Sequence, residues 1–246
     1  RVHRRQRQMC IRDRVFIVDQ ARLAEPPKSM AALLDYAKDH VGRVTYPEPP
    51  NFHGTTFLKQ VLWETTRYPD WLTEPYSEER FKPVTLPMWE YLDALHPNLW
   101  RNGREFPDSA EMMMDLFSDG ILDIALSFNP NDASQRILDG RFAPSVRTYV
   151  HEIGTVGNTH FLAIPFNAQS RDAALIWINL LLSPEAQAEK ADPSIWGDPT
   201  VIDVSRLRSA DRTLFQTIDL GPATLTSQDR GIPLSEPHAS WVEPLE

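Results

Sequence analysis

Residues 153–187 read Ile-Gly-Thr-Val-Gly-Asn-Thr-His-Phe-Leu-Ala-Ile-Pro-Phe-Asn-Ala-Gln-Ser-Arg-Asp-Ala-Ala-Leu-Ile-Trp-Ile-Asn-Leu-Leu-Leu-Ser-Pro-Glu-Ala-Gln, and this stretch decides the fold. The apolar run in residues 159–165 predicts a strand that is covered on both faces. Ser170 is the predicted N-cap of a helix in which residues 173–182 are apolar except for Asn179. Because this run falls well short of the ~20 residues that a bilayer needs, we expect the helix to be buried in a core.

The same alternation of strands and helices continues on either side of this stretch. Apolar runs predict strands at residues 15–19, 121–128 and 146–150. Helical periodicity with capping residues predicts helices after Ser29 and after Thr55 or Thr56, and Ser183-Pro184-Glu185 starts another. The sequence therefore predicts an α/β fold.

Residues 1–14 differ from the rest of the chain in composition. They hold six arginines, one aspartate and Cys10, the only cysteine, and they show no periodicity. A nucleic-acid-binding tail, a solvated disordered tail and a targeting peptide are alternatives, and the wording also resembles translated sequencing-adapter read-through, which we favour. The rest of the chain keeps 19 Lys and Arg against 33 Asp and Glu, and an acidic body argues against nucleic acid or an anionic membrane as partner.

Two loops contain candidate ligand-binding residues. The first follows the prolines of residues 47–50 and enters a predicted helix, where free amides attract polar ligand groups and a glycine allows close approach. Its candidates are Asn51, Phe52, His53, Gly54, Thr55 and Thr56. The alternative for this loop is simple helix capping.

The second loop follows the strand predicted at residues 121–128. In open α/β sheets ligands bind beyond the carboxyl ends of strands, which makes Ser127 and Asn129 candidates. The alternative, equally open, is that these residues only turn the chain into the next helix. Trp89 is a candidate for stacking on a ligand, with core packing as its alternative.

No catalytic, cofactor or metal motif is recognisable. The chain lacks a Gly-x-Ser-x-Gly elbow, a phosphate loop and a dinucleotide fingerprint. His151-Glu152 starts like a zinc-peptidase motif, but Thr155 stands where the second histidine is needed. We therefore predict no catalytic residues, no cofactor and no metal, and a chain that captures a small molecule without reaction.

Several motifs resemble bacterial extracellular solute-binding proteins of ABC importers. They lie at residues 154–161, 164–168 and 182–187, the last reading Leu-Ser-Pro-Glu-Ala-Gln, and further agreement lies at residues 27–29, 46–57, 119–125 and 236–238. The resemblance covers almost everything from Val15 onward. It is strongest to an incompletely characterised branch that is related to iron-, thiamine- and polyamine-binding members.

This resemblance implies an α/β, two-lobed periplasmic-binding-protein-like fold of type II with its first lobe incomplete. It divides the chain into a non-native or disordered basic tail (1–14), the end of the first lobe with a hinge crossing (15–27), a second α/β lobe (28–152), a return to the first lobe (153–205), and a C-terminal helix with a proline-rich tail near the hinge or second lobe (206–246). Gly154 and Gly157 are hinge candidates, and Asn158 lies near the hinge as a candidate ligand contact.

The implied function is that of a periplasmic, monomeric subunit that captures a small ligand between two lobes and delivers it to ABC permease subunits. Its signal peptide is expected to have been lost with the missing N-terminus. An acidic body gives a weak preference for a cationic ligand. Two alternatives stay open, because a fold does not settle function: an enzyme on the same fold, and the ligand-sensing domain of a membrane receptor.

Overall fold

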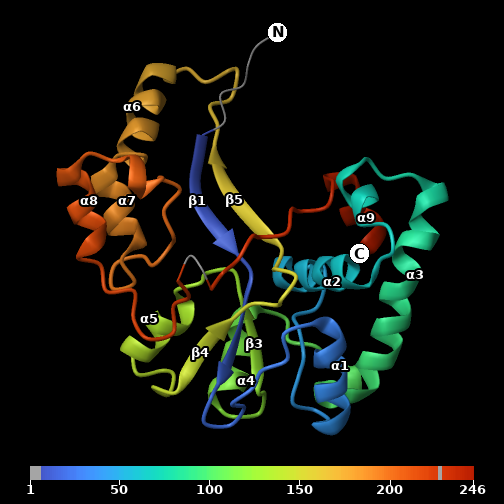
Figure 1. Ribbon diagram of the computed structural model, residues 1–246. Helices are drawn as coiled ribbons and strands as arrows, with labels where there is room; N and C mark the ends of the chain where they lie inside the picture. Colours follow the sequence, from blue (N-terminus) through green and yellow to red (C-terminus); the bar gives the residue numbers. More distant parts are fainter. Residues whose placement is uncertain (1–6, 227–228) are drawn as a thin grey trace.

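An antiparallel three-stranded sheet lies at the centre of the larger part of the molecule. The computed structural model describes residues 7–226 and 229–246 (Figure 1). Strand β2 (Val15–Asp19) lies between β3 (Ile124–Ser127) and β4 (Val146–Tyr149), with Ile17 opposite both Ala125 and Thr148. Every residue of β2 is buried, as its apolar sequence requires. The three strands predicted in these regions are confirmed.

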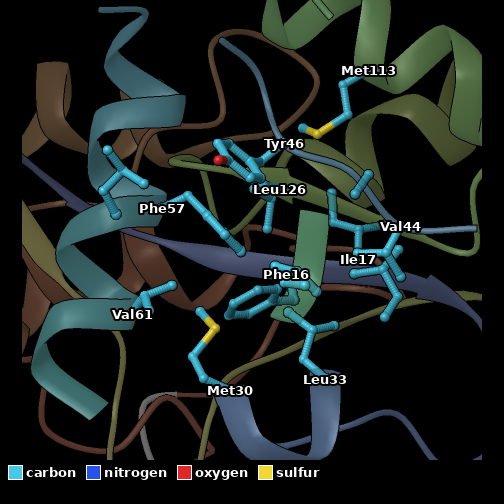
Figure 2. Close-up of a cluster of buried hydrophobic side chains, with 14 of the residues drawn as sticks. Phe16, Ile17, Met30, Leu33, Val44, Tyr46, Phe57, Val61, Met113 and Leu126 are labelled. Atoms are coloured by element: carbon cyan, nitrogen blue, oxygen red, sulfur yellow. The ribbon is translucent and has the colours of Figure 1, made fainter. Parts of the chain in front are cut away.

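Helices cover this sheet and bury one continuous core. They are α1 (Met30–Asp39), α2 (Phe52–Thr65), α3 (Glu78–Leu95), α4 (Ala110–Ser118) and α5 (Asp132–Leu138). Figure 2 shows Phe57 and Val61 of α2 facing Phe16 of β2, with Met30 and Leu33 of α1 closing the cluster. We refer to this sheet with its helices as the second lobe. It includes β2, which the predicted division placed at the end of the first lobe, because β2 pairs with β3 on one side and β4 on the other.

Local capping chemistry explains where these helices start. Ser29 caps α1, because its hydroxyl accepts a hydrogen bond from the amide of Ala32 at 3.1 Å. Helix α2 begins earlier than predicted: its N-cap is Asn51, whose Oδ1 accepts from the amide of His53 at 3.0 Å. The prediction that Thr55 or Thr56 caps this helix is therefore wrong.

A two-stranded ribbon rises from the second lobe. Strand β1 (Arg7–Asp13) pairs antiparallel with β5 (Gly157–Leu162), and Asp13 lies opposite Gly157 (Figure 1). The expectation of a disordered tail over residues 1–14 is wrong for residues 7–14, since 7–13 form β1 and Arg14 is fully buried. Strand pairing uses backbone groups and does not need an apolar sequence. Residues 1–6 lie outside the described part, and the origin of the segment stays a prediction.

A second group of helices lies on the other side of the ribbon from α2 (Figure 1). It consists of α6 (Arg171–Leu181), α7 (Pro184–Ala191) and α8 (Ser209–Gln216). Ser170 is the N-cap residue of α6, as predicted, although its side chain makes no capping bond. We refer to this group, with the loops that join its helices, as the first lobe, following the predicted division of the chain.

The expected burial of α6 and β5 is wrong. Ile178 is the one buried residue of α6 in the structure, whereas Ile176 is 72% and Trp177 60% exposed. Strand β5 is only partly buried and Phe161 is half-exposed. The physical reason is that α6 packs mainly on α7, and β5 pairs with β1 alone among the described strands.

The C-terminal segment returns to the second lobe. The amide of Leu234 donates to the carbonyl of Thr155, and the amide of Gly157 donates to the carbonyl of Leu234, each at 2.9 Å. The chain then runs along α2 and ends in α9 (Val242–Leu245), where Trp241 is completely buried. Three segments thus cross at the base of the ribbon.

Candidate functional site

An aromatic surface joins the start of α2 to the end of β3. The ring of Phe128 lies 4.5 Å from that of Phe52 and 4.9 Å from that of His53, measured between ring centroids. Phe52 is 45% exposed, whereas Phe128 is buried beneath it. The two candidate loops therefore meet in space, as the predicted site requires, and present an aromatic face to solvent.

Phe128, which joins the two candidate loops, was not among the residues predicted from the sequence. It was assigned to the end of a strand, where an aromatic residue is ordinary core. The sequence feature that could have pointed to Phe128 is its position directly after Ser127, the last residue of β3. An aromatic residue just past a strand end lies where the ligands of open α/β sheets bind.

Gly54, Thr55 and Thr56 are buried and serve contacts within the protein. A Cβ on Gly54 would lie 2.0 Å from the carbonyl oxygen of Pro47, so this glycine allows close packing of the proline loop. The Thr55 hydroxyl donates to Glu246 at 2.5 Å, and the Thr56 hydroxyl donates to the carbonyl of Phe52 at 2.9 Å. Both hydroxyls already have partners within the protein.

Ser127 and Asn129 shape the turn into α5. The Ser127 hydroxyl donates to Asp132 at 2.8 Å and accepts from the amide of Asn129 at 3.1 Å. Oδ1 of Asn129 accepts from the amide of Asn131 at 2.9 Å. These bonds support the turn interpretation for the side-chain oxygens of Ser127 and Asn129.

The first lobe contacts this turn directly. Nδ2 of Asn131 donates to the carbonyl of Gly197 at 2.7 Å, and Nδ2 of Asn129 lies 3.6 Å from where a Cβ on Gly197 would stand. Trp196 is half-exposed, with the ammonium group of Lys190 5.6 Å from its ring centre. The loop after α7 thus packs against the turn that follows Phe128.

The other candidates lie elsewhere. Trp89 is on α3, which Figure 1 shows on the side of α2 away from the ribbon, and 37% of its surface is exposed. Asn158 lies in β5 opposite Arg12, and its Oδ1 accepts from the amide of Thr159. Neither belongs to the aromatic surface.

The two hinge candidates differ in their surroundings. Gly154 has a positive φ of 97°, and an added Cβ would lie 2.5 Å from the carbonyl oxygen of Ile232. Gly157 is the first residue of β5 and pairs with Asp13. The contacts around Gly154 already require a glycine for packing.

A buried polar network lies between α2 and the crossing segments. The guanidinium of Arg14 lies over the rings of Phe16 and Phe57, 5.2 and 5.3 Å from their centres, and donates to the carbonyl of Thr56 at 2.7 Å. Burial lowers the pKa of Arg14 to about 9, although the nearby carboxylate of Glu64 acts in the opposite direction. Sequence reasoning missed this network entirely.

Glu64 is the centre of the network. Its Oε1 lies 2.5 Å from Nδ1 of His151 and 2.9 Å from Nε2 of Gln60, and its Oε2 accepts from the amide of Met30 at 2.7 Å. Burial by itself raises the pKa of Glu64. The hydrogen bonds and the charge interaction with His151 outweigh burial, so that the pKa lies below its usual value.

Two cavities lie away from the aromatic surface. One of about 420 Å³ lies beside the crossing segments and is lined by residues 150–154 and 229–232 together with Lys28. The other, of about 220 Å³, lies at the far end of β2 near Asp19 and Arg22. Phe52, His53 and Phe128 line neither of them.

Two kinds of site are not found in the part of the chain that the structure describes. No three or more His, Cys, Asp or Glu side chains there are grouped to hold a metal ion. Each helix within residues 7–226 and 229–246 is too short or too polar to cross a membrane.

Comparison with known proteins places the chain in a family. A family model described as bacterial extracellular solute-binding protein matches residues 10–213. Protein YnjB of Escherichia coli (strain K12) is 43% identical over 231 residues, which is 94% of this chain and 58% of that protein. The chain belongs to the bacterial extracellular solute-binding protein family.

Solved structures support the two-lobed fold. A putative spermidine/putrescine ABC transporter from Listeria monocytogenes superposes with a TM-score of 0.62 at 14% identity, covering 98% of this chain and 67% of that one. The apo ferric ion-binding protein A of Pasteurella haemolytica gives 0.59 at 16% identity, covering 85% and 60%. At these identities the likeness shows the fold alone.

The chain spans about three fifths of the length of the relatives it matches, so its first lobe is incomplete. Helix α6 exposes large apolar side chains. A helix that is apolar nearly all round needs neighbours on most sides, and Ile176 and Trp177 lack them here.

Proposed function

We propose that the complete protein is the extracytoplasmic solute-binding subunit of an ABC importer. A small ligand binds between the lobes, against the aromatic surface of Phe52, His53 and Phe128, and is then handed to the permease subunits. The observation that carries this proposal is the meeting of that surface with the first lobe at Asn131 and Gly197. Family membership and the fold of the solved relatives support it.

The proposal places the protein in the periplasm as a monomer that performs no catalysis and needs no cofactor or metal of its own. Nucleic acid is not a partner, since the body of the chain is acidic. Aromatic faces favour a ligand with a planar or cationic group, which stacking and cation–π attraction stabilise. Polyamine and ferric-ion binding are named for two structural neighbours, and both ligand classes belong in a screen.

The test is a thermal-shift screen of the complete protein against thiamine and its phosphates, polyamines, iron complexes and simple sugars. A ligand at 100 times its dissociation constant should stabilise the protein by about 2.7 kcal/mol. Conversion of a compound to product, with no stabilisation by any intact compound, would refute the binding function.

Phe52→Ala tests the position of the site in the same screen. Because Phe52 is half-exposed, its truncation should leave the unliganded protein folded and weaken binding about tenfold or more, by removing a stacked ring. Phe166→Ala is the matched control, since this ring is 98% exposed in the loop between β5 and α6. Equal affinities of both variants and the wild type would place the ligand elsewhere.

A further inference from the structure

Helix α2 presents a row of polar side chains to the crossing segments. Thr56, Gln60 and Glu64 are spaced by four residues and therefore share one face of the helix. The Gln60 side chain is completely buried, which is costly for an amide unless its hydrogen bonds are satisfied. Its position is therefore set by the partners that it finds on the crossing segments.

Gln60 joins α2 to the second crossing segment at two points. Its Nε2 donates to the carbonyl of Gly154 at 3.0 Å, and its Oε1 accepts from the amide of Val156 at 2.8 Å. Glu64 holds the same segment one turn further along α2 through His151. Residues 151–156 are thus fixed to the second lobe by side chains of a single helix.

The first crossing segment is held by the same helix and by the second segment. Arg14 donates to the carbonyl of Thr56, its amide donates to the carbonyl of Val156 at 3.2 Å, and its carbonyl accepts from the Thr155 hydroxyl at 2.6 Å. These bonds join Arg14 to residues 155–156 and to α2 at once.

The third crossing segment is bound by the neighbouring face of α2. Nε1 of Trp63 donates to the carbonyl of Ser235 at 2.9 Å, and Lys59, which is almost fully buried, pairs with Glu236. Leu234, which precedes these residues, forms backbone hydrogen bonds with Thr155 and Gly157. All three crossing segments are therefore attached to one helix.

We propose that α2 is a clamp that makes the crossing segments, as far as Arg14 and Val156, part of the rigid body of the second lobe. Lobe movement then bends the chain beyond this point, in β5 from Gly157 onward, and Gln60 is the positioning residue of the clamp. The inference rests on the proposed function, in which the lobes move. It assigns the pivot to Gly157 and makes Gly154 a fixed point.

Gln60→Met tests the clamp, because methionine has a similar length and no hydrogen-bonding amide. Hydrogen exchange followed by mass spectrometry should show the Val156 amide exchanging about tenfold faster or more than in the wild type. Gln20→Met, the same substitution at an exposed turn, should leave that rate unchanged. Gln60→Glu keeps an acceptor for the Val156 amide, so this amide should exchange at a rate between those of the wild type and Gln60→Met. This variant tests the clamp if Gln60→Met does not fold.

A distance measurement between the lobes gives the second readout. Spin labels at Lys38→Cys on α1 and Arg206→Cys beside α8, in a Cys10→Ser background, should give a narrow distance distribution that Gln60→Met broadens and Gln20→Met does not. Unchanged Val156 exchange and an unchanged distribution in folded Gln60→Met would overturn the clamp. Both readouts are made without ligand, so a failure of the binding function leaves them interpretable.

Discussion

Trp241→Ala is expected to lower the free energy of unfolding of this chain by about 3–5 kcal/mol, the usual cost of truncating a buried aromatic side chain. Trp241 is completely buried, contacts the ring of Tyr76 edge-on at 5.7 Å, and donates from Nε1 to the carbonyl of Glu74 at 2.9 Å. Its loss leaves a cavity and an unpaired carbonyl. Urea unfolding with linear extrapolation measures the change.

Trp177→Ala is the matched control for this substitution. Trp177 lies on α6 and is 60% exposed, so its removal from this chain should change the free energy of unfolding by no more than about 0.5 kcal/mol. Similar losses for the two variants would mean that Trp241 does not pack against Glu74 and Tyr76 as the structure shows.

Glu64→Ala has the second large expected effect, a loss of about 3–5 kcal/mol, because it removes one member of a buried charged network. The amide of Met30, the side chain of Gln60 and the ring of His151 all lose a partner at once. Leaving buried donors unpaired costs more than a lost surface bond. Chemical unfolding at pH 7 measures the loss, and a change below 1 kcal/mol would contradict the network.

The same carboxylate predicts a pH dependence of stability. Its pKa is lower in the folded protein than its ordinary value of 4.5, so the folded state favours the ionised form. The stabilisation is present above pH 4.5 and is lost as the pH falls through the folded pKa. Unfolding curves of Glu64→Gln should therefore show a shallower loss of stability below pH 4.5 than the wild type. Parallel acid limbs for the two proteins would contradict this assignment.

Local signals in the sequence predicted much of the fold. The β2 strand follows from its continuous apolar residues, and Ser29 identifies the start of α1 because a hydroxyl at that position satisfies a free amide. The family motifs in residues 154–187 predicted the two lobes, which the solved relatives support. These features depend on neighbours along the chain or on a pattern already known.

Burial and long-range polar contacts were beyond the reach of the sequence. Helix α6 has the composition of a buried helix, but its exposure depends on how much of the first lobe faces it, and this chain covers only 58% of YnjB. Gln60 and Glu64 look like ordinary surface residues of a helix, and their partners in residues 151–156 lie 87 to 96 residues away. Nothing local distinguishes a buried glutamine from an exposed one.

The candidate site shows the same division. Phe52 and Asn129 were predicted as ligand contacts from their positions at a helix start and a strand end, and the structure brings these two loops together through Phe128. Thr55 and Thr56 fit the same pattern, but their hydroxyls are occupied by Glu246 and by the helix backbone. The direction of a side chain on α2 depends on what packs against the helix, which the sequence does not show.

Hydrogen exchange of the complete protein, with and without the compound that gives the largest thermal shift, tests the central claim most directly. Binding between the lobes predicts that the ligand slows amide exchange locally at residues 51–54 and 127–131. Near Asp19 and Arg22, exchange should slow only as much as the general stabilisation of the protein by ligand requires. Slower exchange confined to the region of Asp19 and Arg22, with residues 51–54 and 127–131 unchanged, would contradict a ligand held between the lobes.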